Sequence, residues 1–125
     1  MPTAAQASRK PRLMFHVTFH VADADADEFL RHLRTTFEAV TAEPECLFVD
    51  TYWDPRHHGT IRIVEEWACD REWFVNVQMP KKYYDAYRAA TEDMYIKERE
   101  FVTNPPSRLF STGFWFRFSV GYEVL

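Results

Sequence analysis

The sequence lacks the features that would place the protein in a membrane or direct it out of the cell. No apolar run approaches the roughly 20 residues that a membrane-spanning helix needs. Residues 1–12 are small, polar and mildly basic, and they contain no hydrophobic segment of the signal-peptide type. We therefore expect a cytoplasmic protein with no membrane partner, in which residues 1–12 form a flexible tail.

Positive charge and cysteine are also scarce, and each shortage excludes a class of function. The net charge is −4, the isoelectric point is about 5.7, and no basic patch stands out beyond the tail. We therefore expect no nucleic-acid partner. Cys46 and Cys69 are the only cysteines, and their spacing is not that of a metal site or a redox pair. We expect two buried thiols.

Aromatic residues, by contrast, are abundant. They make up 17% of the 125 residues, which is well above ordinary usage. A chain of this length suits a single domain, so much of this aromatic surface must be buried in one core, in a pocket or at a subunit interface.

The stretch Thr60–Trp73 carries the clearest indication of a site. Two isoleucines alternate with Glu65 and Trp67, so all four side chains share one face of a strand. Asp70 follows as a helix N-cap. A carboxylate and an indole at the end of a core strand are placed to line a pocket, although an indole there is more often a core residue.

Leu13–Val21 also alternates, with an apolar face and a face that carries His16 and His20. On a strand these two histidines lie about 13 Å apart, at about 3.3 Å per residue, which is too far for both to bind one zinc ion. We interpret them as polar groups at a pocket or a subunit interface. A helix follows and runs to about Ala42.

The order of the remaining elements indicates an α+β fold, a ferredoxin-like βαββαβ sandwich with helices on one sheet face. The other sheet face then needs cover, which predicts a homodimer. Residues 13–110 would form the domain. Residues 111–125 would form an extension whose strand pairs with its own sheet or, as we favour, packs at the dimer interface. The predicted elements are strands at Cys46–Trp53 and Thr60–Ala68 around a loop at Asp54–Gly59, helices at Asp70–Gln78 and Lys81–Val102, a short strand at Ser107–Phe110 and a terminal strand at Phe114–Val124.

In their order and spacing, several motifs resemble the antibiotic biosynthesis monooxygenase family of dimeric α/β-barrel proteins. The resemblance covers about residues 13–110. The motifs are Phe15–Val21, Glu43-Pro44-Glu45-Cys46-Leu47, Tyr52-x-Asp54-Pro55, and Glu65-x-Trp67 followed by a helix and Pro80.

The chain departs from this family pattern at two positions. Glu45 stands where glycine is common, and Asn76 falls about where many members carry a helix histidine. Members that degrade haem use such a histidine as the iron ligand. No histidine lies between His58 and the C-terminus, which argues against haem binding.

The resemblance implies an enzyme that oxidises a phenolic or anthrone-like polyketide aromatic to a quinone with molecular oxygen and without a cofactor. Such an enzyme must hold a flat apolar ring, help to remove a proton and stabilise an anion. Trp67 matches the family's pocket tryptophan, and Asn76 is placed to bond a carbonyl or peroxide oxygen. The candidate bases are Glu65, His16 and His20, and the residues that would complete an aromatic cavity are Trp73, Phe74, Tyr84 and Tyr87.

Two other classes of function stay open. The first is a non-oxidative polyketide-tailoring enzyme on the same scaffold, such as a cyclase, isomerase or decarboxylase. The second is a ligand-binding dimer without catalysis, in which Trp67 and the tyrosines are core residues. Arg62 and Arg88 are able to balance a phenolate, although a solvated arginine is the commoner role for each.

Overall fold

One antiparallel sheet organises the fold, with its strands in the order β4-β1-β3-β2-β5. The computed structural model describes residues 11–103 and 123–124. This arrangement confirms the predicted ferredoxin-like α+β fold. The elements are β1 (Leu13–Val21), the 3-10 turn η1 (Asp23–Asp25), α2 (Ala26–Thr41), β2 (Cys46–Asp54), β3 (His57–Trp67), α3 (Arg71–Trp73), the π-helix η2 (Phe74–Gln78), α4 (Tyr83–Thr91), β4 (Tyr95–Thr103) and β5 (Glu123–Val124).

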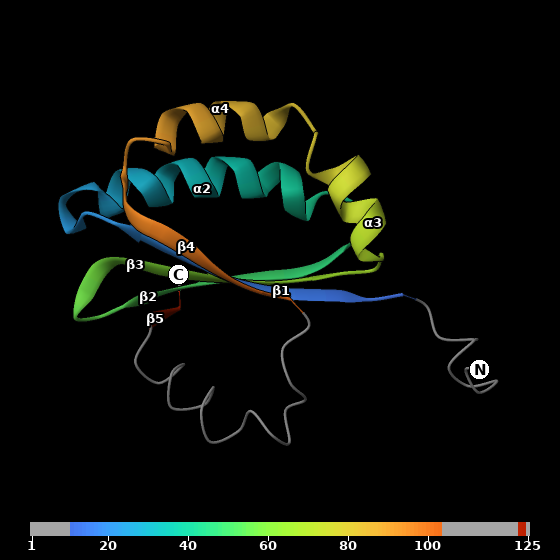
Figure 1. The fold of residues 1–125 in the computed structure, drawn as a ribbon, viewed down its shortest axis with the longest axis horizontal. Helices are drawn as coiled ribbons and strands as arrows, with labels where there is room; N and C mark the ends of the chain where they lie inside the picture. The colour runs from blue at the N-terminus through green and yellow to red at the C-terminus, as the bar shows by residue number, and fades with distance from the viewer. Residues whose placement is uncertain (1–10, 104–122, 125) are drawn as a thin grey trace, which may run out of the picture.

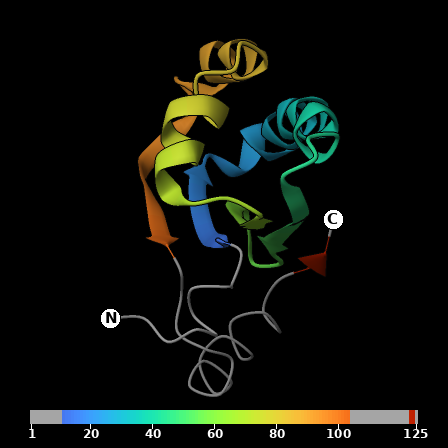
Figure 2. The ribbon, with the colours of Figure 1, turned by 90° about the vertical axis from the view of Figure 1, so that its right-hand side faces the viewer.

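The helices lie together on one face of the sheet (Figures 1 and 2). Helices α2 and α4 run over the strands, and α3 lies near the end of the sheet where β3 finishes. None of the helices in residues 11–103 is long and apolar enough to cross a membrane.

The alternation of β1 sends its large apolar side chains toward the helices. Phe15, Val17 and Phe19 are all buried, whereas His16 and His20 point to the opposite face of the sheet. The ring of Phe19 packs 5.4 Å from that of Phe29 on α2, measured between centroids. Each such buried ring stabilises the fold by roughly 1.5–3 kcal/mol.

The β2–β3 hairpin is tighter than the sequence predicted. We expected a loop over Asp54–Gly59, but β3 begins at His57. The Asp54 carboxylate accepts a hydrogen bond of 2.9 Å from the Arg56 backbone N–H, which closes the turn within two residues. His57 and His58 are exposed.

The predicted helix over Lys81–Val102 was wrong in its second half. Helix α4 ends at Thr91, and Tyr95–Thr103 form the edge strand β4, paired with β1. The charged run of residues 97–100 has high helix propensity, and an exposed edge strand buries too few residues to show a clear alternation. Backbone pairing with β1 overrides that local preference.

The segment after β3 begins as the predicted helix and then changes to a π-helix. The Asp70 carboxylate caps α3 by accepting a 2.8 Å hydrogen bond from the Trp73 backbone N–H. From Phe74 the helix becomes π-helical, with the Met79 N–H donating to the Phe74 carbonyl at 2.9 Å. Such single π-turns are frequent at functional sites.

Two sequence predictions fall largely outside the described residues. They are the short strand at Ser107–Phe110 and most of the terminal strand at Phe114–Val124. The described part of the latter, β5, pairs with β2 of the same chain, Trp53 opposite Glu123. Packing of this extension at a dimer interface stays a prediction. Cys69 is buried and Cys46 half-buried, both as free thiols.

Gly59 offers a test of this packing. A Cβ atom at this position would lie 1.9 Å from the backbone oxygen of Val21. The backbone of β3 would therefore have to move away from the end of β1. We expect Gly59→Ala to lower the free energy of unfolding by about 1–3 kcal/mol in urea titrations. His58→Ala, at the exposed neighbouring position, should change it by less than about 0.5 kcal/mol. Equal effects of the two substitutions would contradict the packing described here.

Candidate active site

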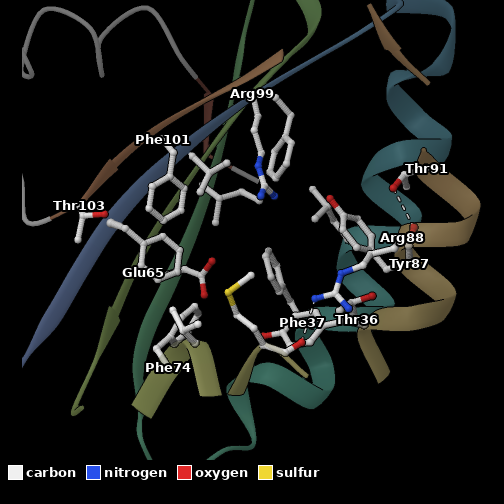
Figure 3. Close-up of a pocket in the computed structure, with 18 of the residues that line it drawn as sticks. Thr36, Phe37, Glu65, Phe74, Tyr87, Arg88, Thr91, Arg99, Phe101 and Thr103 are labelled. Atoms are coloured by element: carbon white, nitrogen blue, oxygen red, sulfur yellow. Dashed lines mark hydrogen bonds between the residues drawn. The ribbon is translucent and has the colours of Figure 1, made fainter. Parts of the chain in front are cut away.

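A cavity of about 590 Å³ lies between the sheet and the helices (Figure 3). Its walls come from β1, β3, β4, α2, α4 and the α3–η2 segment. Most of the lining is apolar, including Phe15, Phe74 and Phe101. The volume falls within the range of small-molecule binding sites, which is roughly 300–1,000 Å³, and such sites also have a mostly apolar lining.

Glu65 is the buried carboxyl group in this cavity. It lies on the central strand β3, on the same face as the core residue Ile63, and only 7% of its surface is exposed. Burial removes water from the carboxylate and raises the pKa of Glu65 to about 7, although a hydrogen bond from Trp67 opposes the rise. The group therefore changes its charge near neutral pH.

Trp67 supports Glu65 from behind the cavity. The indole is fully buried, and its Nε1–H donates to Oε1 of Glu65 at 3.0 Å. Its ring packs edge-on against Phe74, with centroids 5.2 Å apart, and Phe74 in turn contacts Phe15. The indole is not among the residues that line the cavity. It fixes the orientation of the carboxyl group, and only Oε1 of that group is bonded to a described residue.

Tyr84 and Tyr87 reach the cavity from α4. Burial raises the pKa of both phenols, so both remain protonated hydrogen-bond groups at neutral pH. The hydroxyl of Tyr87 lies 3.2 Å from that of Tyr95. In Figure 3 Tyr87 lies across the cavity from Glu65.

A buried amide holds Tyr84 in place. Gln78 is fully buried, and its Nε2 donates to the hydroxyls of Tyr83 at 2.6 Å and Tyr84 at 2.9 Å. The Tyr83 hydroxyl donates to Glu43, which forms an ion pair with Lys81 at 2.7 Å. Sequence reasoning missed Gln78, because a polar residue at the end of a helical run normally faces solvent. The π-turn brings it inward.

The two candidate histidines lie on the other face of the sheet, outside the cavity. Burial and the nearby Arg62 guanidinium lower the pKa of His16 to about 4, so its imidazole is neutral at pH 7. Nε2 of His20 lies 3.4 Å from the Glu100 carboxylate. Arg62 is buried there and donates to Thr18 Oγ1 at 3.2 Å, so the expectation that it is solvated was wrong.

Two further candidates from the α3–η2 segment also lie outside the cavity lining. Asn76 is exposed, and Trp73 is half-buried beneath the Lys81 ammonium group, 6.0 Å from its ring centroid. The structure thus brings Glu65, Phe74, Tyr84 and Tyr87 together around one cavity, with Trp67 directly behind them.

Three arginines line the cavity, and the sequence analysis had identified only one of them as a candidate. Arg88 was a candidate, but Arg71 and Arg99 were not. Arg99 lies on β4 and alternates with Phe101 and Thr103, so all three reach the cavity from one face of the strand. Recognition of β4 as a strand would have revealed this pattern.

The polar side chains that line the cavity carry carboxyl, phenol, guanidinium and threonine hydroxyl groups. Within residues 11–103 and 123–124, no group of three or more His, Cys, Asp or Glu side chains is placed to hold a metal ion. The arrangement is able to hold a flat ring against aromatic walls and to exchange a proton with it through Glu65.

Comparison with known proteins relates this fold and sequence to oxygenases. No protein-family model matches the chain. The curated protein "Putative monooxygenase GME11364" from Pestalotiopsis microspora is 35% identical over 94 residues, which cover 75% of this chain and 78% of that protein.

Solved structures share the fold at lower identity. A crystal structure of an antibiotic biosynthesis monooxygenase has a TM-score of 0.67 and 19% identity over 76% of this chain and 98% of its own. PA3566 from Pseudomonas aeruginosa has a TM-score of 0.68 and 16% identity over 80% of this chain and 99% of its own. With the 35% identical monooxygenase relative, these matches confirm the resemblance inferred from the motifs, and the chain belongs to the antibiotic biosynthesis monooxygenase family.

Proposed function

We propose that this protein is a cofactor-independent monooxygenase that oxidises a phenolic or anthrone-like polyketide aromatic to a quinone with molecular oxygen. The observation that carries the proposal is the buried Glu65 carboxyl, whose pKa is about 7, in a cavity walled by aromatic rings. A base of this pKa is suited to proton abstraction at neutral pH. The monooxygenase relative supports the reaction class.

The apolar lining of the cavity supports an aromatic substrate. The apolar walls would bind the faces of a flat polycyclic ring, with Phe15, Phe74 and Phe101 as the nearest aromatic contacts. Phe15 and Phe101 stack with their centroids 5.2 Å apart, so this wall is already packed before a ligand arrives. A rigid ring in a prearranged cavity loses little conformational freedom on binding.

Glu65 would take the first proton. Its Oε1 is occupied by the Trp67 N–H, so Oε2 is the atom that accepts a proton from the ring carbon or hydroxyl. The product of this step is a neutral carboxylic acid, which the buried site tolerates well, and a delocalised substrate anion. We assign this role to Glu65 and not to His16 or His20, which lie on the other sheet face.

The remaining chemistry would belong to the substrate anion and oxygen. One electron passes from the anion to O2, and the resulting radical pair combines to form a carbon–oxygen bond as a peroxide. Glu65 returns its proton to the outer peroxide oxygen and becomes a carboxylate again. It then removes the second hydrogen of the ring carbon as a proton, the electron pair of that C–H bond forms the carbonyl, and the O–O bond breaks. The departing hydroxide takes the proton from Glu65 and leaves as water. For an anthrone the balance is anthrone plus O2 to anthraquinone plus water. The protonated Tyr84 hydroxyl, which lines the cavity, would stabilise the substrate oxyanion by a hydrogen bond.

Oxygen consumption by chelator-treated protein tests this proposal. With a panel of anthrones and hydroquinones, we expect oxygen uptake and a quinone product, and the quinone formed from an anthrone should have gained one oxygen atom and lost two hydrogens. Glu65→Gln should lower kcat by about 10²–10⁴-fold, because general-base catalysis contributes that much. In the native protein kcat should rise with pH through about 7, as the Glu65 carboxyl ionises.

Glu66→Gln is the matched control, because Glu66 is the next residue on β3 and its carboxylate pairs with Arg12 at 2.8 Å. It should leave kcat unchanged. Loss of water or carbon dioxide from the substrate without oxygen uptake would refute the oxygenase and favour the non-oxidative alternative. Equal kcat values for Glu65→Gln and the native protein would remove Glu65 from the mechanism.

We also propose that the protein is a homodimer whose sheets pack through the face opposite the helices. Among the described residues, the helices cover only one side of the sheet (Figure 2). Light scattering should give a mass about twice the 14.9 kDa of one chain. A mass of one chain at micromolar concentration would refute the dimer.

A further inference from the structure

The exposed part of the cavity lining is basic. Among the described residues, its charged members are Arg71, Arg88 and Arg99 and one exposed acid, Glu92, and we call these four residues the rim. Glu65, by contrast, lies in the buried interior and is only partly ionised at neutral pH. A ligand in the cavity therefore meets an excess of positive charge where it contacts solvent.

Arg88 is held over the cavity by contacts that do not neutralise it. Its Nη2 donates to the Met79 carbonyl at 2.9 Å, and its guanidinium lies 5.3 Å from the ring centroid of Tyr84. The nearest carboxylate, on Asp85, is at 3.5 Å and largely exposed, so this ion pair is weak. The planar guanidinium thus keeps a fixed position and retains free N–H donors.

Arg99 faces the cavity from β4. In the part of the chain that the structure describes, its guanidinium forms no hydrogen bond or ion pair. Figure 3 shows the Arg88 and Arg99 side chains directed into the cavity from different walls, with the Glu65 carboxyl on a third side. Arg99 is also close enough to Tyr87 for its charge to oppose the rise in the pKa of that phenol.

We propose that Arg88 and Arg99 bind a carboxylate substituent of the substrate, so that the substrate is an aromatic acid. Two guanidinium groups that face one cavity are a common arrangement for binding a carboxylate. This inference rests on the proposed function for the identity of the ring. It adds that the ring carries an acid group and enters in one orientation, with the acid at the rim and the reacting carbon at Glu65.

The location of the two arginines favours a permanent acid over the anion formed during the reaction. A carboxylate at the exposed rim keeps part of its hydration, so binding it there avoids the large cost of burying a charge. An enolate oxygen forms on the ring itself, which lies in the apolar interior beside Tyr84. The rim arginines are thus placed for a substituent.

A binding experiment tests the acid site independently of turnover. The probes are anthraquinone-2-carboxylate and its neutral isostere anthraquinone-2-carboxamide, titrated by calorimetry into the intact native protein and into Arg99→Gln. We expect the native protein to bind the acid at least about tenfold more tightly than the amide. Arg99→Gln should weaken acid binding about tenfold and leave amide binding unchanged. Arg99→Lys should recover part of the loss.

Arg31→Gln is the matched control. Arg31 is an exposed arginine on α2 that lies outside the cavity lining, with a guanidinium nitrogen 3.5 Å from Glu28, and its loss should change neither dissociation constant. Equal affinity of the native protein for acid and amide would overturn the acid site. So would an equal loss of both affinities in Arg99→Gln, or a loss of kcat that is the same for acid and neutral anthrones. Preferential acid binding without oxygen uptake on any anthrone would uphold the site and refute the oxygenase.

Discussion

The site depends on a carboxyl group buried against an indole N–H. Glu65 lies on the central strand β3 with its Oε1 bonded to Trp67, and the loss of water raises its pKa from 4.5 to about 7. The folded chain therefore holds this proton more tightly than the unfolded chain does. As a consequence, the contribution of Glu65 to stability falls as pH rises from about 4.5 through about 7 and stays low above it. This loss of stability arises at the residue that would serve as the base in the proposed reaction.

The surrounding elements keep that carboxyl group dry and oriented. Antiparallel pairing with β1 places Phe15 opposite Glu65 on the same sheet face. The π-turn of η2 sets Phe74 against the indole and turns Gln78 inward, where its amide fixes the hydroxyl of Tyr84. The strand register, the π-turn and the buried Gln78 amide thus position the side chains that line the cavity. Its interior favours the neutral acid, and its basic rim favours anions.

Sequence patterns predicted those parts of this arrangement that follow from local periodicity. Alternation in β1 and β3 placed Glu65 and Trp67 on the core face, and Asp70 was recognised as the helix cap. The sequence analysis missed the edge strand β4, because its charged, exposed residues do not alternate between apolar and polar along the whole strand. Arg99 lies on this strand and was missed for the same reason. The inward turn of Gln78 depends on a π-turn that no residue type specifies. The sequence did not determine on which face of the sheet His16 and His20 lie, because this depends on which face of β1 packs against α2.

The most direct test of this account is the ionisation of Glu65 itself. Infrared difference spectra of the native protein minus Glu65→Gln isolate the carbonyl stretch of the protonated carboxylic acid. We expect this band to be present at pH 6 and to disappear with a midpoint near pH 7. Its absence above about pH 5, the behaviour of an ordinary solvated glutamate, would show that the carboxylate is hydrated and would contradict the central role of its burial.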